Sequence, residues 1–186
     1  LSIDNISNKD SVFIYYCNDI DSNYTIDLTI SFYDNKGESR YKENVKQILV
    51  QSNISKKIIS ICLKDIEGFN PKTDYIYVEG DINGKTIDAH SFFVKPKDYI
   101  RPIGDPKFKT KKVKIKRKRG YYGKKYNIYL KSDNVIRNTV IELSYKHSST
   151  ETIIMDILPH KNNFIYSFYK NYMPKKPFKI INTNLQ

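Results

Sequence analysis

The sequence contains no tryptophan, only two cysteines and only three histidines among its 186 residues. Two cysteines do not make the disulfide framework that holds many small secreted domains together. We interpret Cys17 and Cys62, which lie in apolar, strand-like stretches, as two buried thiols, and a bridge between them stays open if their strands are neighbours. The histidines His90, His147 and His160 stand alone, without a second ligand at the spacing of a metal site. The sequence therefore predicts neither a metal nor another cofactor.

Long apolar runs and catalytic signature motifs are also missing. No run approaches the roughly 20 residues of a membrane helix, and no charged segment followed by an apolar one opens the chain. There is no phosphate-binding glycine loop, nucleophile elbow or H-E-x-x-H motif. The opening Leu1-Ser2-Ile3-Asp4 leads us to expect a piece of a longer protein. We predict no membrane span and no catalytic residue in this chain.

Apolar residues instead alternate with polar ones at a period of two. The alternation is clearest over residues 24–32, where every second side chain is apolar, so this segment is predicted to be a strand with one buried face. Asn83-Gly84 suits a tight turn and predicts a hairpin between residues 75–80 and 86–94. Further strands are expected at 12–17, 45–50 and 58–63, with a polar link over 51–57. No window shows a sustained helical period, so the first half is predicted to be all-β with six or seven antiparallel strands.

The second half repeats this pattern after a proline-rich segment. Three prolines, Pro96, Pro102 and Pro106, fall within eleven residues together with Gly104, and a central strand cannot continue through them. We interpret the segment as a stiff strut between two domains, residues 1–97 and 98–186. About six strands are expected in the second. The predicted fold is two tandem immunoglobulin-like antiparallel β-sandwiches.

Charge is distributed very unevenly between these halves. Residues 1–97 carry a net charge of −2 and residues 98–186 a net charge of +14. Nine of the thirteen residues from 107 to 119 are Lys or Arg. Val113 and Ile115 alternate with lysines there, so we expect a strand with a charged outer face and buried aliphatic side chains. The candidate contact residues on this basic strand and in the turn after it are Lys111, Lys112, Lys114, Lys116, Arg117, Lys118, Arg119, Tyr121 and Tyr122.

Two interpretations of the basic strand stay open. Rows of lysine protect edge strands from pairing with other chains, or simply form a solvated surface. Alternatively, the row holds a polyanion or a glycan, with the two tyrosines close by. Nucleic acid is disfavoured, because base readout would require Arg, Asn or Gln aimed at base edges, and single-strand binding would require aromatics interleaved with the cations.

Three segments resemble a known family in their order and spacing. They are Phe92-Phe93-Val94-Lys95-Pro96-Lys97, Leu130-Lys131-Ser132-Asp133 and Asp156-Ile157-Leu158-Pro159-His160. Together they resemble the C-terminal Ig-like β-sandwich domains of glycoside hydrolase family 2 β-mannosidases. His160 stands where the family has a turn glycine, and polar residues 148–152 replace an aromatic-rich stretch.

The resemblance implies that the chain is a non-catalytic accessory part of a β-mannosidase-like hydrolase. The parent would hydrolyse terminal β-mannosides on a barrel domain absent from this chain, using two glutamates, and that barrel would be the chain's partner. The family's acid/base glutamate follows an asparagine, which no glutamate here does, so no catalytic residue carries over. The rival is a free-standing module that binds a carbohydrate or polyanion through residues 107–119. The compartment stays open, with an extracytoplasmic or lysosome-like one slightly favoured.

Overall fold

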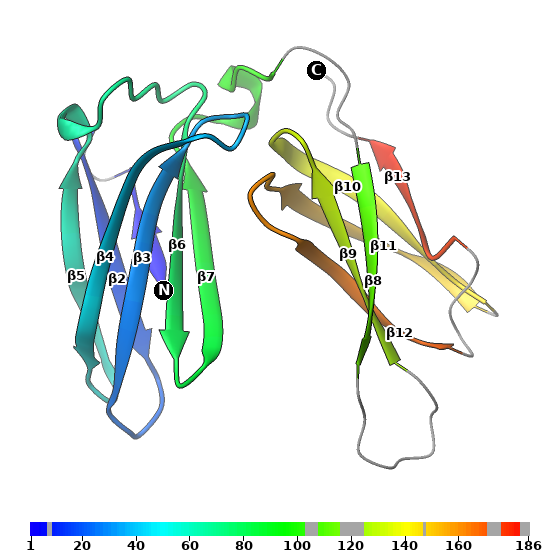
Figure 1. The fold of residues 1–186 in the computed structure, drawn as a ribbon, viewed down its shortest axis with the longest axis horizontal. Helices are drawn as coiled ribbons and strands as arrows, with labels where there is room; N and C mark the ends of the chain where they lie inside the picture. The colour runs from blue at the N-terminus through cyan, green and yellow to red at the C-terminus, as the bar shows by residue number, and fades with distance from the viewer. Residues whose placement is uncertain (7–8, 103–107, 116–124, 147, 171–175, 183–186) are drawn as a thin grey trace. The chain divides into compact units, whose positions relative to one another are not determined.

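In a computed structural model the chain is built of β-strands and divides into two compact units, residues 1–100 and 101–186 (Figure 1). The structure describes residues 1–6, 9–102, 108–115, 125–146, 148–170 and 176–182. Each unit holds antiparallel sheets around its own hydrophobic core. The predicted fold class, two tandem Ig-like antiparallel sandwiches, is confirmed.

The first unit contains a three-stranded sheet in the order β1-β2-β5 and a four-stranded sheet in the order β4-β3-β6-β7. Ile14 of β2, Phe32 of β3 and Ile76 of β6 are fully buried in one core between them. The strands are β1 (Ser2–Asp4), β2 (Ser11–Asn18), β3 (Tyr24–Tyr33), β4 (Ser39–Val50), β5 (Ile54–Cys62), β6 (Tyr75–Ile82) and β7 (Lys85–Phe92), with 3-10 turns η1 (Leu63–Asp65) and η2 (Pro96–Asp98).

Two strand predictions in this unit are confirmed in detail. On β3, Ile26, Leu28 and Ile30 are buried, as the alternation required. β6 pairs with β7 from Tyr75 opposite Phe92 to Ile82 opposite Lys85. Asn83 and Gly84 between them have positive φ angles of 52° and 78°, which is the geometry that an Asn-Gly turn adopts readily.

The predicted ends of β4 and β5 were wrong. β4 begins at Ser39 rather than at residue 45. Its register against β3 shifts between Ile26 and Leu28, beside Gln47 at φ 55°. The bulge lies within the predicted part of the strand, whereas the missed residues 39–44 are polar at five of six positions and belong to a strand at the edge of its sheet. β5 begins at Ile54, within the expected polar link, and lies at the edge of its sheet, where polar side chains can face water.

The expectation of two buried thiols is wrong for Cys17. Cys17 is exposed and Cys62 is half-buried, and both are free thiols. Their strands β2 and β5 are neighbours, but Cys17 lies opposite Ser55 and Cys62 lies opposite Ser11. The two sulfur-bearing residues therefore sit at opposite ends of the strand pair, roughly 20 Å apart by strand rise, which is too far for a bridge.

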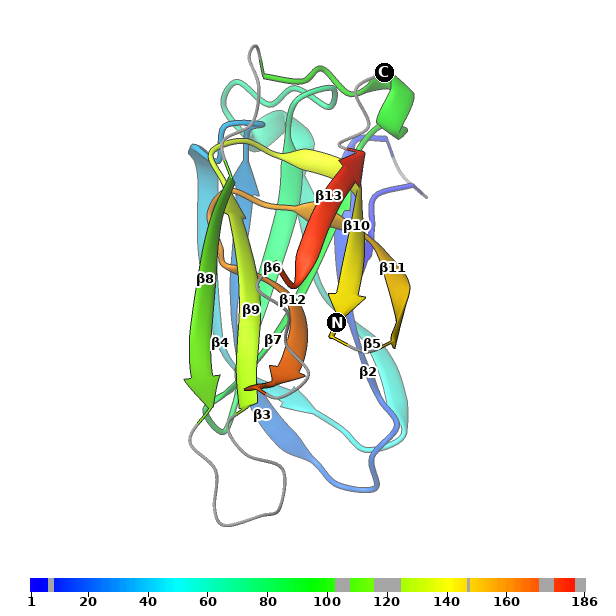
Figure 2. The same ribbon diagram turned by 90° about the vertical axis from the view of Figure 1, so that its right-hand side faces the viewer.

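The second unit contains sheets in the orders β12-β9-β8 and β11-β10-β13 (Figure 2). Its core is built around Ile128, Ile141, Leu143 and Phe168. The strands are β8 (Phe108–Ile115), β9 (Lys125–Ser132), β10 (Ile136–Tyr145), β11 (Ser148–Ile157), β12 (Asn163–Tyr169) and β13 (Phe178–Asn182). Within the described residues, no helix is long and apolar enough to cross a membrane.

Candidate functional site

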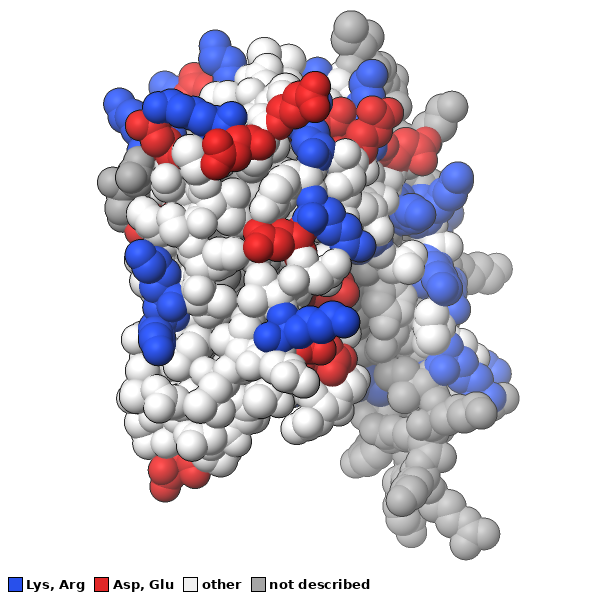
Figure 3. Space-filling view, turned by 60° about the vertical axis from the view of Figure 1, so that its left-hand side comes forward, with Lys and Arg blue, Asp and Glu red and all other residues white. Residues whose placement is uncertain are grey.

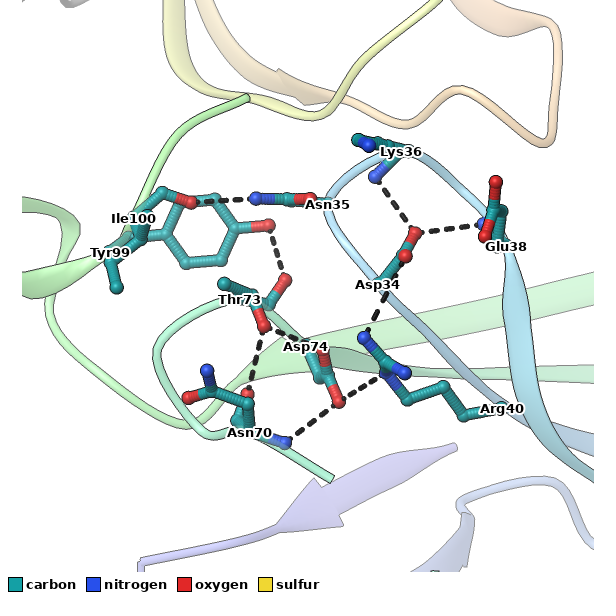
Figure 4. Close-up of polar contacts among 10 residues, drawn as sticks. All are labelled: Asp34, Asn35, Lys36, Glu38, Arg40, Asn70, Thr73, Asp74, Tyr99 and Ile100. Atoms are coloured by element: carbon teal, nitrogen blue, oxygen red, sulfur yellow. Dashed lines mark hydrogen bonds and ion pairs between the residues drawn. The ribbon is translucent and has the colours of Figure 1, made fainter. Parts of the chain in front are cut away.

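The last residues of the first unit are tied to two loops at one end of that unit (Figure 4). The Tyr99 hydroxyl donates a hydrogen bond to the carbonyl oxygen of Thr73 at 2.8 Å. The Ile100 amide donates to the carbonyl of Lys72 at 2.7 Å, and the Ile100 carbonyl accepts from Asn35 Nδ2 at 2.9 Å. Three hydrogen bonds thus fix the point at which the chain leaves the unit.

A buried carboxylate organises the first of these loops, residues 70–74. Asp74 has no exposed surface. Its Oδ2 accepts the Asn70 amide at 2.9 Å and its Oδ1 accepts the Thr73 hydroxyl at 2.8 Å. Arg40 Nε lies 2.9 Å from Asp74 Oδ2. A buried charge is tolerated when it is paired and its lone pairs are satisfied, and Asp74 meets both conditions.

A second carboxylate shapes the turn between β3 and β4. Asp34 Oδ1 accepts the amides of Lys36 and Glu38, each at 2.9 Å, so the side chain replaces backbone partners within the turn. The Asp34 Oδ2 lies 3.7 Å from Arg40 Nη2. Arg40 therefore bridges the two loops with one guanidinium group, whose planar fork suits two carboxylates.

These contacts form one connected set, which we call the joint network. It links the β3–β4 turn, the 70–74 loop and the residues that end the first unit (Figure 4). Its members are Asp34, Asn35, Arg40, Asn70, Thr73, Asp74, Tyr99 and Ile100.

Stacked aromatic rings support the joint network beside the sheet. Tyr75 is fully buried, and its ring centroid lies 5.7 Å from that of Tyr33 and 5.5 Å from that of Phe92. Phe92 in turn contacts Tyr99 edge-on at 5.3 Å. Burial raises the pKa of the Tyr75 hydroxyl far above its usual value, so the ring stays neutral. Each such pair contributes about 0.5–1.5 kcal/mol beyond the area it buries.

The polar groups of this site have a structural role. Its carboxylates accept backbone amides and a guanidinium and are placed as loop anchors. In the described part of the chain, no group of three or more His, Cys, Asp or Glu side chains could hold a metal ion. His90 is exposed on β7, with its ring 5.9 Å from Phe92. What the arrangement can do is hold residues 99 and 100 rigidly against the first unit.

Within the predicted strut, the hydrogen bonds that anchor the chain are made by Tyr99 and Ile100, which lie between Pro96 and Pro102. Pro96 begins the short turn η2, and Pro102 is half-buried. Pro106 lies outside the described residues. The joint network was not predicted from the sequence, because Asp34-Asn35 and the 70–74 loop have the composition of ordinary turns. No sequence signal indicated that they pair with Arg40, Tyr99 and Ile100.

The basic strand lies at the edge of its sheet, as β8 beside β9. Lys111, Lys112 and Lys114 are exposed. The candidates Lys116, Arg117, Lys118, Arg119, Tyr121 and Tyr122 lie outside the described residues, so their contacts stay a prediction.

The expected orientation of β8 is wrong. Lys112 lies opposite Ile128, which is fully buried, whereas Val113 lies opposite Asn127 and is 37% exposed. Directly paired residues share a sheet face, so lysine occupies the core side of this strand and valine the outer side. An edge strand permits this, because a lysine stem can run over the margin of the core while its ammonium reaches water.

Residues 10–98 match the family model described as Mannosidase Ig/CBM-like domain. This segment runs from just before β2 to η2 and takes in the two loops of the joint network. No curated protein matches the sequence significantly.

Two solved structures share the fold across most of the chain. The β-D-mannosidase from Dictyoglomus thermophilum matches with a TM-score of 0.67 and 16% identity, over 97% of this chain and 21% of that one. The Amycolatopsis orientalis exo-chitosanase CsxA, in complex with PNP-β-D-glucosamine, matches with a TM-score of 0.57 and 11% identity, over 88% of this chain and 23% of that one. The chain thus spans between a fifth and a quarter of each protein.

Proposed function

Residues 10–98 belong to the mannosidase Ig/CBM-like domain family, and from this premise we propose that the chain is a non-catalytic accessory part of a β-mannosidase-like glycoside hydrolase. In this proposal the catalytic barrel belongs to the same parent protein and hydrolyses terminal β-mannosides. The family match is the observation that carries the proposal. The shared fold with two much longer enzymes, over most of this chain, supports it.

The proposed role is mechanical, and the joint network is the feature that suits it. An accessory domain can fix the position of the domain next to it only if the chain leaves the accessory domain at a defined point. Asn35 donates a hydrogen bond to residue 100, and the carbonyls of Lys72 and Thr73 accept hydrogen bonds from residues 100 and 99. Pro102 follows two residues after Ile100, and its ring fixes its own φ angle.

The purified chain provides a direct test. We expect it to fold, with the circular dichroism of a β-protein, and to release no nitrophenol from 4-nitrophenyl β-mannoside. The physical reason is that a retaining glycosidase needs two carboxyl groups placed across the scissile bond, and we propose that the parent's barrel supplies them. The parent enzyme or another β-mannosidase serves as the positive control. Turnover by this chain that persists through repurification would contradict the accessory role.

A further inference from the structure

The outer face of the sheet β12-β9-β8 gathers cations and aromatic rings in transverse rows. Ile128, Leu130 and Ser132 of β9 are buried, so the side chains that alternate with them along the strand face outward. Across the sheet, Lys111 lies opposite Tyr129 and Tyr129 lies opposite Phe164. Because paired residues share a face, these three form one outer row.

A second row lies one step along the strands and consists of two lysines. Lys109 of β8 is directly opposite Lys131 of β9, and both are exposed. Like charges directly opposite each other destabilise a sheet. An anion bound between the two ammonium groups would remove this repulsion.

The row on the other side of the aromatic one holds the exposed Val113 of β8 beside two polar residues, Asn127 and Ser167. Asn127 Nδ2 donates to the Tyr129 hydroxyl at 3.2 Å, and the Ser167 hydroxyl donates to Asn127 Oδ1 at 2.5 Å. Beyond them, Lys125 Nζ lies 5.8 Å from the centre of the Tyr169 ring. The face thus combines ammonium groups, hydrogen-bonding groups and rings.

The charged side chains of the three strands that form this face all have one sign. The segments FKTKKVKI, KYNIYLKS and NFIYSFY, which form the three strands, contain no Asp or Glu. On the visible face of the first unit, by contrast, charges of both signs are interspersed (Figure 3). A surface lined by one sign of charge concentrates ligands of the opposite sign.

We propose that this outer face binds an anionic polysaccharide, a pyranose chain bearing carboxylate or sulfate groups. The ammonium groups pair with the acidic substituents. The exposed ring of Phe164, 49% accessible, packs against the apolar face of a sugar ring. Asn127 and Ser167 supply hydrogen bonds to hydroxyl groups. This inference goes beyond the proposed accessory role and does not depend on it.

Two features favour a polysaccharide over a nucleic acid as the occupant. All cations of the three strands are lysines, and none is an arginine, the residue whose planar fork most often reads guanine base edges. The rings of Tyr129 and Phe164 meet at 63° with centroids 5.7 Å apart. Such an edge contact does not give the series of parallel platforms on which successive bases stack.

The test measures binding of the full chain to polygalacturonate, heparin and an oligothymidylate by affinity electrophoresis at low and moderate salt. We expect binding to polygalacturonate, heparin or both, weakening as salt rises because the contacts are screened. Lys111→Glu should weaken this binding by about tenfold, because repulsion replaces attraction at the end of the row that holds Tyr129 and Phe164. Phe164→Ala should weaken it while leaving its salt dependence unchanged.

The matched control is Lys176→Glu, at an exposed lysine just before β13 of the other sheet of the same unit. It alters net charge equally and should change affinity by less than about twofold, since exposed charges beyond a Debye length are screened. Equal losses in the Lys111 and Lys176 variants would overturn the proposal, because attraction would then follow net charge alone. Binding to neither polysaccharide, or binding to the oligonucleotide alone, would also overturn it. Melting curves of each variant establish that it is folded.

Discussion

Replacing Arg40 with alanine should destabilise the first unit by about 3 kcal/mol. The substitution leaves the carboxylate of Asp74 fully buried without its guanidinium partner 2.9 Å away. Removing one member of a buried pair costs about 3–5 kcal/mol, because an uncompensated charge remains. We expect the lower end, since the Arg40 side chain is itself 32% exposed. Urea unfolding, monitored by a signal that reports only on the first unit, measures the change in its free energy of unfolding.

A surface ion pair in the same unit provides the matched control. Lys64 Nζ lies 3.5 Å from Asp10 Oδ1, with side chains 74% and 64% exposed. Lys64→Ala should therefore cost less than about 1 kcal/mol. The double variant Arg40→Ala with Asp74→Asn should recover part of the loss, because the buried charge is gone. If the Arg40 and Lys64 variants were equally stable, the joint network would not be the anchor described above.

Replacing Phe168 with alanine should unfold the second unit selectively. Phe168 is 2% exposed, and its ring lies 5.1 Å from that of Tyr166 and 5.5 Å from that of Tyr145. Truncating a buried phenylalanine costs about 3–5 kcal/mol through lost burial and the cavity left behind. For a domain of this size that lowers the melting temperature by at least about 12 °C.

The reason for selectivity is that each unit has its own core. We propose that the units are independently folding domains, so the amide NMR signals of residues 9–100 should keep their positions while those of the second unit collapse. Phe32→Ala is the reciprocal control, because Phe32 is buried in the first core, against Tyr41, Phe69 and Phe93. Collapse of both sets of signals in either variant would show a single cooperative unit.

The strands that could be predicted from the sequence are those in which buried and exposed side chains alternate regularly along the strand. β3 alternates because one face packs on the core, and the Asn83-Gly84 turn demands positive φ angles that few other pairs adopt. Only the second half of β4 was predicted, because residues 39–44 are almost all polar on a strand at the edge of its sheet. Such a segment has no apolar alternation that would indicate a strand.

The joint network and the orientation of β8 could not be predicted from the sequence for a different reason. Arg40 is separated from Asp74 by more than thirty residues, and its partner depends on how two loops meet after folding. On β8, lysines and aliphatic residues alternate, so the pattern allows either face to be buried. Burial normally selects the aliphatic one. At a sheet edge that selection is weak, and the register with β9 placed Lys112 on the core side instead.

The central claim is that the chain serves as an accessory part of a larger glycoside hydrolase. An antibody raised against the purified 186-residue chain tests it in extracts of cells that produce the protein. We expect the antibody to detect a polypeptide much larger than 21.9 kDa and to deplete activity against 4-nitrophenyl β-mannoside together with it. Complete removal of the antigen as a 21.9 kDa chain, with the β-mannosidase activity left in the extract, would contradict the account.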